Sequence, residues 1–342
     1  MPQETNLRKD SKGHAARRVV TVNVRPPLRE SQKPLSFYCS TNNTATGYGR
    51  ICSAFLEAME LNRVGLHMRP DIVLDIPGST AFEKIRFTMW EASSLPKSCY
   101  GFMHGMSLIV PSRHNVDVFR DAGYKNPIHV IPLWGDSVFR PMPTSGPFKF
   151  ICVGKENGVP KRKGMDQLVS CFKRAFQGVT DVRLTLKRSP DCSRFDPADE
   201  RISVVTSDLS KAEYELMLSQ HHCGVFLSGL EGWNFPACEL MATGRPSIVI
   251  PYGGPADFTT RMTSWHLEYG MTRAPEDHPY YGVGFGAVAA NDSVIESMRD
   301  AFSNWSRLLE KGNLSLAASA MFTKQAFQSR LRSVIQAQLG RC

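Results

Sequence analysis

Two carboxylates that stand eight positions apart, Glu231 and Glu239, are the side chains best placed to do chemistry in this chain of 342 residues. An ionised carboxylate can accept hydrogen bonds from two hydroxyl groups at once. A pair of carboxylates is also the arrangement that hydrolyses glycosidic bonds. The pair is therefore compatible with hydroxyl binding and with hydrolysis, and the surrounding residues must decide between them.

The residues around the two acids predict a strand, a tight loop, a helix and a second strand. Pro236 stands where the helix would begin, which places Glu239 near its start, and the Gly-Arg-Pro that follows would end it. Apolar residues at 225–227 and 248–250 are typical of buried parallel strands. One acid thus lies in the loop and the other at the helix start, at the carboxyl edge of a sheet, where α/β proteins bind ligands.

The rest of the chain repeats a strand–helix rhythm on both sides of a Pro-rich connector at 140–147. Two doubly wound sheets with a ligand cleft between them are the economical interpretation. Late helices are predicted at 293–310 and 314–340. The predicted organisation is a basic flexible tail (1–33), an N-terminal Rossmann-like domain (34–141), a C-terminal Rossmann-like domain (142–320) and a helix that crosses back to the first domain (321–342).

Composition limits the class of protein. The apolar fraction of 42% is ordinary for a soluble protein, and no apolar run approaches the ~18 residues that span a bilayer. The first residues lack the apolar core of a signal peptide. The nine cysteines are scattered and odd in number, which predicts reduced core thiols in a cytoplasmic protein. Metal-ligand spacing is absent, so no metal is expected.

The charge is concentrated at the amino terminus. The net charge is +9, and residues 1–33 supply +5 of it through eight Lys/Arg against three Asp/Glu. The simpler interpretation is a solvated tail, and the alternative is attraction to nucleic acid or to an anionic membrane surface. No aromatic residues are interleaved with these charges, so nothing favours nucleic acid specifically.

Several motifs accompany the two acids. In the second half of the chain they are Glu231-Gly232, Glu239, Gly244-Arg245-Pro246, Gly253-Gly254 and Asp257. Earlier motifs are Gly154-Lys155, Lys163-Gly164, Ser207-Asp208-Leu209-Ser210 and Gly47-Tyr48-Gly49. In these residues the chain resembles the retaining glycosyltransferases of the GT-B fold, family 4 type, in a compact version similar to bacterial and phage sequences. The resemblance implies an α/β fold with two Rossmann-like, doubly wound domains facing a cleft, the first (34–141) on the acceptor side and the second (142–320) binding the nucleotide sugar.

The resemblance also implies a cationic clamp for the diphosphate of a nucleotide sugar. Lys155 and Lys163 match the family's basic pair, with Arg162 in reserve. Such cations stabilise the negative charge that develops on the leaving group. Lys155 stands where the family usually has Arg, and it keeps the charge while losing the bidentate geometry. This clamp and the glycine loops have no role in hydrolysis, which argues against a glycoside hydrolase.

Other roles follow from the same resemblance. Glu239 is expected to accept hydrogen bonds from the ribose hydroxyls, and Glu231 to face the donor sugar as nucleophile, hydroxyl ligand or stabiliser of the charged transition state. Gly47 and Gly49 would let the backbone approach the donor phosphates.

Residues 232–235 would offer backbone N–H groups to the sugar. The expected donor-binding residues of this loop are Gly232, Trp233, Asn234 and Phe235. Asn234 replaces a glycine of the family's Gly-Phe-Gly, and Asn tolerates positive φ better than most residues. The family often has a His in the first domain where this chain has Trp90 and Glu91, which are candidates for the acceptor or sugar side.

The implied function is transfer of a sugar from a nucleotide sugar to a hydroxyl acceptor, with retention of configuration and with no metal or other cofactor. The acceptor is expected to be a glycan, a lipid or DNA. One alternative is a phage-type DNA glycosyltransferase that acts on a hydroxylated base. Another is a GT-B-fold binding module without catalysis. Peripheral membrane contact also stays open, because the tail is basic.

Overall fold

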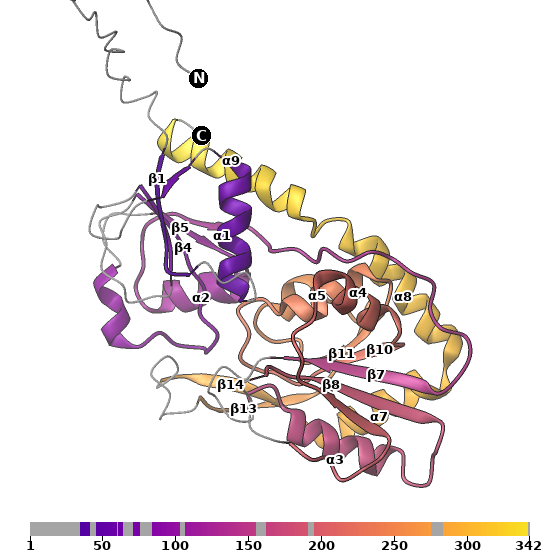
Figure 1. Ribbon diagram of the computed structural model, residues 1–342. Helices are drawn as coiled ribbons and strands as arrows, with labels where there is room; N and C mark the ends of the chain where they lie inside the picture. The colour runs from indigo at the N-terminus through magenta and orange to yellow at the C-terminus, as the bar shows by residue number, and fades with distance from the viewer. Residues whose placement is uncertain are drawn as a thin grey trace, which may run out of the picture. The chain divides into compact units, whose positions relative to one another are not determined.

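The strands and helices were identified in a computed structural model that describes residues 35–41, 46–59, 61–63, 71–75, 84–102, 107–154, 162–190, 195–274 and 283–340. The predicted basic tail and Lys155 lie outside these residues. The described chain forms two parallel six-stranded sheets and a two-stranded antiparallel ribbon, with helices around them (Figure 1).

The first sheet has the strand order β2-β1-β3-β4-β5-β6, and all its pairs are parallel. The chain leaves β1 towards one edge and returns to pair β3 on the other side of β1, which creates a point where the strand order reverses. The strands are β1 (Leu35–Cys39), β2 (Leu61–Arg63), β3 (Ile72–Leu74), β4 (Ile85–Phe87), β5 (Ser107–Val110) and β6 (Ile128–Val130). Its helices are α1 (Gly47–Ala58), η3 (Lys97–Phe102) and α2 (Arg113–Asp121).

The second sheet has the order β12-β11-β10-β7-β8-β9, which is the order of dinucleotide-binding domains with the reversal between β7 and β10. Every residue of β10 is buried, as expected for a parallel strand covered on both faces. The strands are β7 (Phe148–Val153), β8 (Val182–Lys187), β9 (Ile202–Val205), β10 (Cys223–Phe226), β11 (Ser247–Val249) and β12 (Ser264–His266). The helices are α3 (Met165–Ala175), α4 (Lys211–Ser219), α5 (Phe235–Ala242), α6 (Pro255–Phe258) and α7 (Asn291–Ser303).

The end of the chain differs from its prediction. Instead of two helices there are three: α7, α8 (Trp305–Ser319) and α9 (Lys324–Leu339). The Asn304 side chain accepts a hydrogen bond from the amide of Arg307 at 3.1 Å and begins α8. The Thr323 hydroxyl accepts one from the amide of Ala326 at 3.1 Å and begins α9. Polar capping residues therefore divide a stretch whose apolar spacing is continuous.

Helix α9 packs against α1 of the first domain (Figure 1). Phe327, Leu331 and Ile335 are fully buried there. The ring of Phe327 lies 6.1 Å from that of Phe55 on α1 and 6.4 Å from that of Phe87 on β4. The last helix thus completes the core beneath the first sheet.

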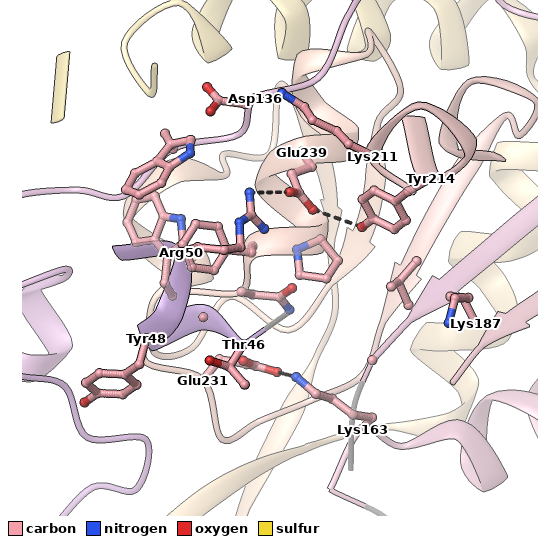
Figure 2. A pocket seen from close by; sticks show the side chains of 18 of the residues that line it. Thr46, Tyr48, Arg50, Asp136, Lys163, Lys187, Lys211, Tyr214, Glu231 and Glu239 are labelled. Atoms are coloured by element: carbon pink, nitrogen blue, oxygen red, sulfur yellow. Dashed lines mark hydrogen bonds and ion pairs between the residues drawn. The ribbon is translucent and has the colours of Figure 1, made fainter. Parts of the chain in front are cut away.

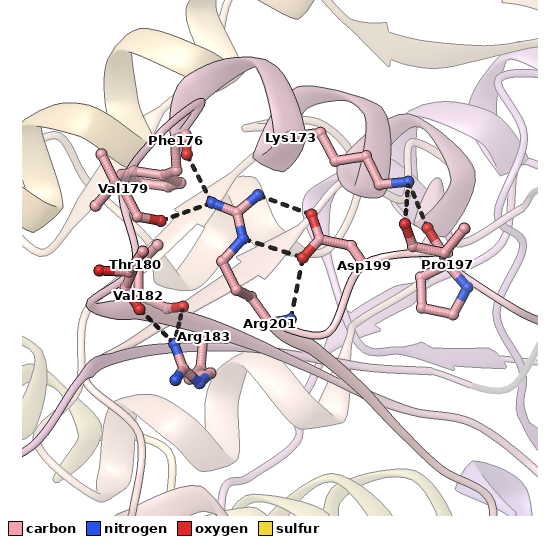
Figure 3. Close-up of polar contacts among 10 residues, drawn as sticks. Lys173, Phe176, Val179, Thr180, Val182, Arg183, Pro197, Asp199 and Arg201 are labelled. Atoms are coloured by element: carbon pink, nitrogen blue, oxygen red, sulfur yellow. Dashed lines mark hydrogen bonds and ion pairs between the residues drawn. The ribbon is translucent and has the colours of Figure 1, made fainter.

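Two arginines satisfy backbone carbonyls where helices end, which is where a cation is favoured. Arg201 grips the Asp199 carboxylate with two nitrogens, at 3.0 and 2.7 Å, and donates to the carbonyls of Phe176 and Val179 beyond α3 (Figure 3). Arg245 is 1% exposed and donates to five carbonyls. Those belong to Ser219, the last residue of α4, to His221 after it, to Thr243 after α5, and to Arg140 and Pro141 in the connector.

The antiparallel ribbon was not predicted. It pairs β13 (Tyr269–Arg273) with β14 (Phe285–Ala289), and all five residues of β13 are exposed. The carbonyl of Ala287 approaches Gly229 so closely that a Cβ there would lie 1.8 Å from the oxygen. The ribbon therefore rests against the loop that carries Glu231.

Candidate active site

A cavity of about 920 Å³ is the candidate site (Figure 2). Its walls come from segments that follow β1, β4 and β6 in the first sheet and β7, β8, β9 and β10 in the second, and from the start of α9. Strands β7 and β10 flank the point where the order of the second sheet reverses, and ligands of α/β proteins bind at such points. The cavity therefore lies where the fold itself predicts a ligand.

Glu231 and Lys163 form a buried ion pair in this cavity, as Figure 2 shows. The side chains are 6% and 10% exposed. Beside them, Nη1 of Arg162 lies 3.1 Å from the Glu91 carboxylate, 3.1 Å from the carbonyl of Leu230 and 4.0 Å from Oε1 of Glu231. Two cations and two acids are thus clustered, and their opposite charges balance.

Glycines fix the positions of this pair. A Cβ on Gly154, at the end of β7, would lie 2.7 Å from Cγ of Lys163, so the lysine stem runs directly over the glycine backbone. On the other side, Gly253 at φ +68° lies against the carbonyl of Glu231, which also accepts a hydrogen bond from the amide of Gly254 at 2.8 Å. Larger residues at these positions would displace the pair.

The electrostatic balance keeps Glu231 ionised. Burial alone would raise the pKa of this carboxyl, but Lys163 and Arg162 outweigh burial and lower it. Burial, and then the charge of Arg162, lower the pKa of Lys163, while Glu231 opposes them. Removal of either partner would leave an uncompensated charge in a buried site.

Glu239, in α5, is held by two side chains from other elements. Its Oε1 lies 2.7 Å from Nη2 of Arg50 in α1, and its Oε2 accepts a hydrogen bond from the hydroxyl of Tyr214 in α4 at 2.9 Å (Figure 2). Burial raises the pKa of Glu239, and Arg50 and Tyr214 counteract part of that rise. Both carboxylate oxygens thus have a donor, and each retains further acceptor capacity.

Asn234 begins α5 in the left-handed conformation, with φ +81°. Its Oδ1 accepts a hydrogen bond from the amide of Ala237 at 3.2 Å, so it caps the helix that carries Glu239. Asn234, which stands where the glycosyltransferases that the chain resembles have glycine, keeps the turn and adds a cap.

Asn234→Ala is expected to lower the free energy of unfolding by about 2 kcal/mol. The cap is lost, and alanine has no polar side chain that could stabilise a backbone with positive φ. Asn234→Gly, the matched control, should cost only about 0.5 kcal/mol, since glycine adopts this conformation freely. Urea unfolding of both variants measures the difference. Equal losses would show that the backbone conformation is not the strained element.

The structure brings most of the predicted site residues into one cavity. Its walls include Gly47, Trp90, Glu91, Lys163, Glu231, Trp233, Asn234, Phe235 and Glu239. Gly49 and Gly232 are not among the lining residues. The Gly49 amide donates a hydrogen bond at 3.1 Å to the hydroxyl of Thr46, which caps α1. A Cβ on Gly232 would lie 2.8 Å from Sδ of Met89. Lys155 lies outside the described residues.

The two predicted tryptophans are mainly packed side chains. Trp233 is 2% exposed, and its ring lies 4.8 Å from that of Phe258 and 5.8 Å from that of Phe322. Trp90 is 4% exposed, and its indole N–H donates to the carbonyl of Ser94 at 2.7 Å. Their indoles have little surface to offer a ligand, so any contact would come chiefly from their backbone.

Arg50 and Tyr214 are site residues that the sequence did not reveal. Arg50 directly follows the Gly-Tyr-Gly motif, and Tyr214 comes one helical turn after the cap residue Ser210. Both positions are adjacent to recognised motifs, which is the signal that could have drawn attention to them. Lys187 and Arg188, at the end of β8, also line the cavity.

Within the described residues, no three His, Cys, Asp or Glu side chains are grouped so that they could hold a metal ion. A search of the same residues found no helix with the length and apolar character needed to cross a membrane. The described cysteines are buried, and no disulfide joins them.

Comparison with known protein families and with curated proteins gave no match. Among solved structures, the lipopolysaccharide outer core galactosyltransferase WaaB in its apo form is similar, with 14% identity and a TM-score of 0.62 over 90% of this chain and 100% of that chain. A mutant of S. aureus TarM in complex with Fondaparinux, alpha-GlcNAc-glycerol and UDP has 12% identity and a TM-score of 0.56 over 77% of this chain and 55% of that chain.

The pneumococcal O-GlcNAc transferase GtfA, in complex with UDP and GlcNAc, has 14% identity and a TM-score of 0.56 over 78% of this chain and 57% of that chain. The chain thus spans just over half the length of TarM and GtfA. At such low sequence identity, these structural similarities support a shared fold alone. The predicted fold class is confirmed: the chain has two parallel-sheet, Rossmann-like α/β domains of the GT-B fold.

Proposed function

We propose that this protein is a glycosyltransferase that moves a sugar from a nucleotide-sugar donor to a hydroxyl acceptor, with retention of configuration and without a metal ion. The observation that carries the proposal is the convergence of Glu231, Lys163 and Glu239 on one cavity at the carboxyl edge of the second sheet. These are the motif residues for which the sequence resemblance implies donor binding. The named activities of WaaB and GtfA, on the same fold, add support.

In this proposal the donor lies across the cavity from Lys163 to Glu239. Lys163 and Arg162 bind the diphosphate, with Lys155 as a second clamp. Glu239 accepts hydrogen bonds from the ribose hydroxyls. Glu231 is the partner of Lys163 in the free protein, and the diphosphate competes for that lysine. Donor binding thereby releases Glu231 to face the sugar.

Transfer then needs little further machinery from the protein. The leaving phosphate oxygen takes the proton of the attacking hydroxyl on the same face of the sugar, which preserves the anomeric configuration. Lys163 and Arg162 stabilise the charge that develops on the diphosphate, and this stabilisation is strong because both side chains are buried. Trp90 and Glu91 lie on the wall proposed for the acceptor, which is a glycan, a lipid or DNA.

A panel of nucleotide sugars tests the proposal directly. Release of nucleoside diphosphate is measured for each donor with glycan, lipid and modified-DNA acceptors, with and without EDTA. One donor should give acceptor-dependent release that EDTA does not lower, and NMR of the product should show the donor's anomeric configuration. A protein that binds no nucleoside diphosphate and releases none from any donor would contradict the proposal.

Glu239→Ala is expected to weaken binding of the nucleoside diphosphate by about tenfold or more, because hydrogen bonds to a charged acceptor contribute about 1.5–3 kcal/mol each. The turnover number should change little, since Glu239 is proposed to touch the ribose and not the reacting atoms. Calorimetric titration and steady-state kinetics give the two values. Glu310→Ala, an exposed acid on α8, is the control and should behave as wild type.

A further inference from the structure

Arg50 is a first-domain cation that reaches the acid of the second domain. It comes from the first turns of α1, and its side chain is 29% exposed, whereas that of Glu239 is 6% exposed. Its guanidinium also lies over the ring of Phe235, 4.2 Å from the centroid. That ring in turn makes an edge contact with Trp134, with centroids 5.5 Å apart. The guanidinium is therefore held between a carboxylate and a packed aromatic face.

We propose that Arg50 is a positioning residue that orients the Glu239 carboxylate for the two hydroxyls of the donor's ribose. This inference rests on the proposed function. An ionised carboxylate has about four lone-pair sites. Arg50 takes one on Oε1 and Tyr214 takes one on Oε2, so each oxygen keeps a site for one hydroxyl. Held from two sides, the carboxylate cannot rotate away from the cavity.

The inference links ribose recognition to the first domain. Glu239 belongs to α5 and Tyr214 to α4, both in the second domain, but the third member of the cluster belongs to α1. The ribose site is complete only while α1 lies against the start of α5. Loss of the Arg50 charge should therefore affect a ligand that carries ribose hydroxyls and spare a ligand that lacks them.

The protonation of Glu239 provides a second readout. The groups that face it are Arg50 from α1, Tyr214 from α4, Asp136 from the segment after β6 and the neighbouring Cys238. Burial raises the pKa of Glu239, Arg50 and Tyr214 lower it, and Asp136 raises it. Without Arg50 the pKa rises further, so the carboxylate is lost at a higher pH than in the wild type. Binding through ribose should then begin to weaken at a higher pH as the solution is acidified.

The first step measures binding of UDP, GDP and ADP to the wild type and selects the diphosphate that binds most tightly. The second step compares this ribose form with its 2′,3′-dideoxy form, by calorimetry from pH 5.5 to 8. Arg50→Met should weaken binding of the ribose form by about tenfold and that of the dideoxy form by less than about twofold. Arg50→Lys keeps the charge and should recover most of the loss. Arg261→Met, on an exposed arginine, is the matched control. The dideoxy form carries the same diphosphate, so it cancels the titration of the phosphates.

The outcomes separate the two proposals. Equal weakening of both ligands by Arg50→Met, or no weakening of either, overturns the role of Arg50 while donor binding by the wild type stands. A wild type that binds none of the three diphosphates overturns the proposed function and this inference with it. If Arg50→Met does not fold, Arg50→Gln gives the same comparison with a polar, neutral side chain. If binding of the ribose form has the same pH dependence in Arg50→Met as in the wild type, the inference is also overturned.

Discussion

Replacement of Lys163 by methionine is expected to lower the turnover number for sugar transfer by about a hundredfold or more. Preorganised groups that stabilise developing charge typically contribute factors of about 10²–10³ to turnover. Lys163 is buried, so no solvent dipole can take its place at the proposed diphosphate site. Steady-state kinetics with the donor identified by the nucleotide-sugar panel measures the effect.

The same substitution should also destabilise the protein. It leaves Glu231 in a buried site with Arg162 4.0 Å away as the remaining cation, and breaking a buried pair costs about 3–5 kcal/mol. The double variant Lys163→Met, Glu231→Gln removes both charges and should recover most of that stability without recovering turnover. If the double variant regained activity as well, the loss in the single variant would reflect folding, and Lys163 would have no role at the diphosphate.

Arg245→Met is expected to lower the free energy of unfolding by about 4 kcal/mol, which is among the largest losses that single substitutions cause. The guanidinium is nearly inaccessible and serves five carbonyls, and each buried acceptor left without a donor costs about 1–3 kcal/mol, partly relieved by relaxation. Burial lowers the pKa of Arg245 to about 10, so the side chain is charged at neutral pH and favourable beside the ends of α4 and α5. Urea unfolding provides the value.

Arg201→Met is the matched control for this prediction. Arg201 also serves carbonyls at a helix end, but it has its own carboxylate partner and its side chain is 16% exposed. Loss of the Arg201 side chain should cost roughly half as much, about 2 kcal/mol, because water can reach the carbonyls that lose their donor. Similar costs for both substitutions would mean that burial of the carbonyls is not what makes Arg245 important.

The fold could be predicted because its signals are local. Buried strands such as β7 and β10 are short apolar runs, and the start of α5 is marked by Pro236. Glu231 and Lys163 could be named because each stands in a recognisable motif. The division between α8 and α9 was also encoded locally, in the cap residue Thr323, but the continuous apolar spacing obscured it.

The partners of Glu239 could not be predicted in the same way. Arg50 meets it only because two separate sheets present α1 and α5 to one another, and no spacing in the sequence expresses that contact. Trp233 is similar: its place in a glycine-bearing loop suggested a ligand contact, and packing against Phe258 and Phe322 placed its ring in the core. Tertiary packing, not local pattern, decides such positions.

The last helix has a consequence for synthesis of the chain on the ribosome. Residues of α9 close the core beneath the sheet that is translated first, so the aromatic side chains of Phe55 on α1 and Phe87 on β4 stay uncovered until translation is almost finished. The second sheet lies in the sequence between the first sheet and α9, so it can form before α9 is translated. A nascent chain that is stalled before Phe327 would therefore expose a chaperone-binding surface on a domain whose strands have all been made.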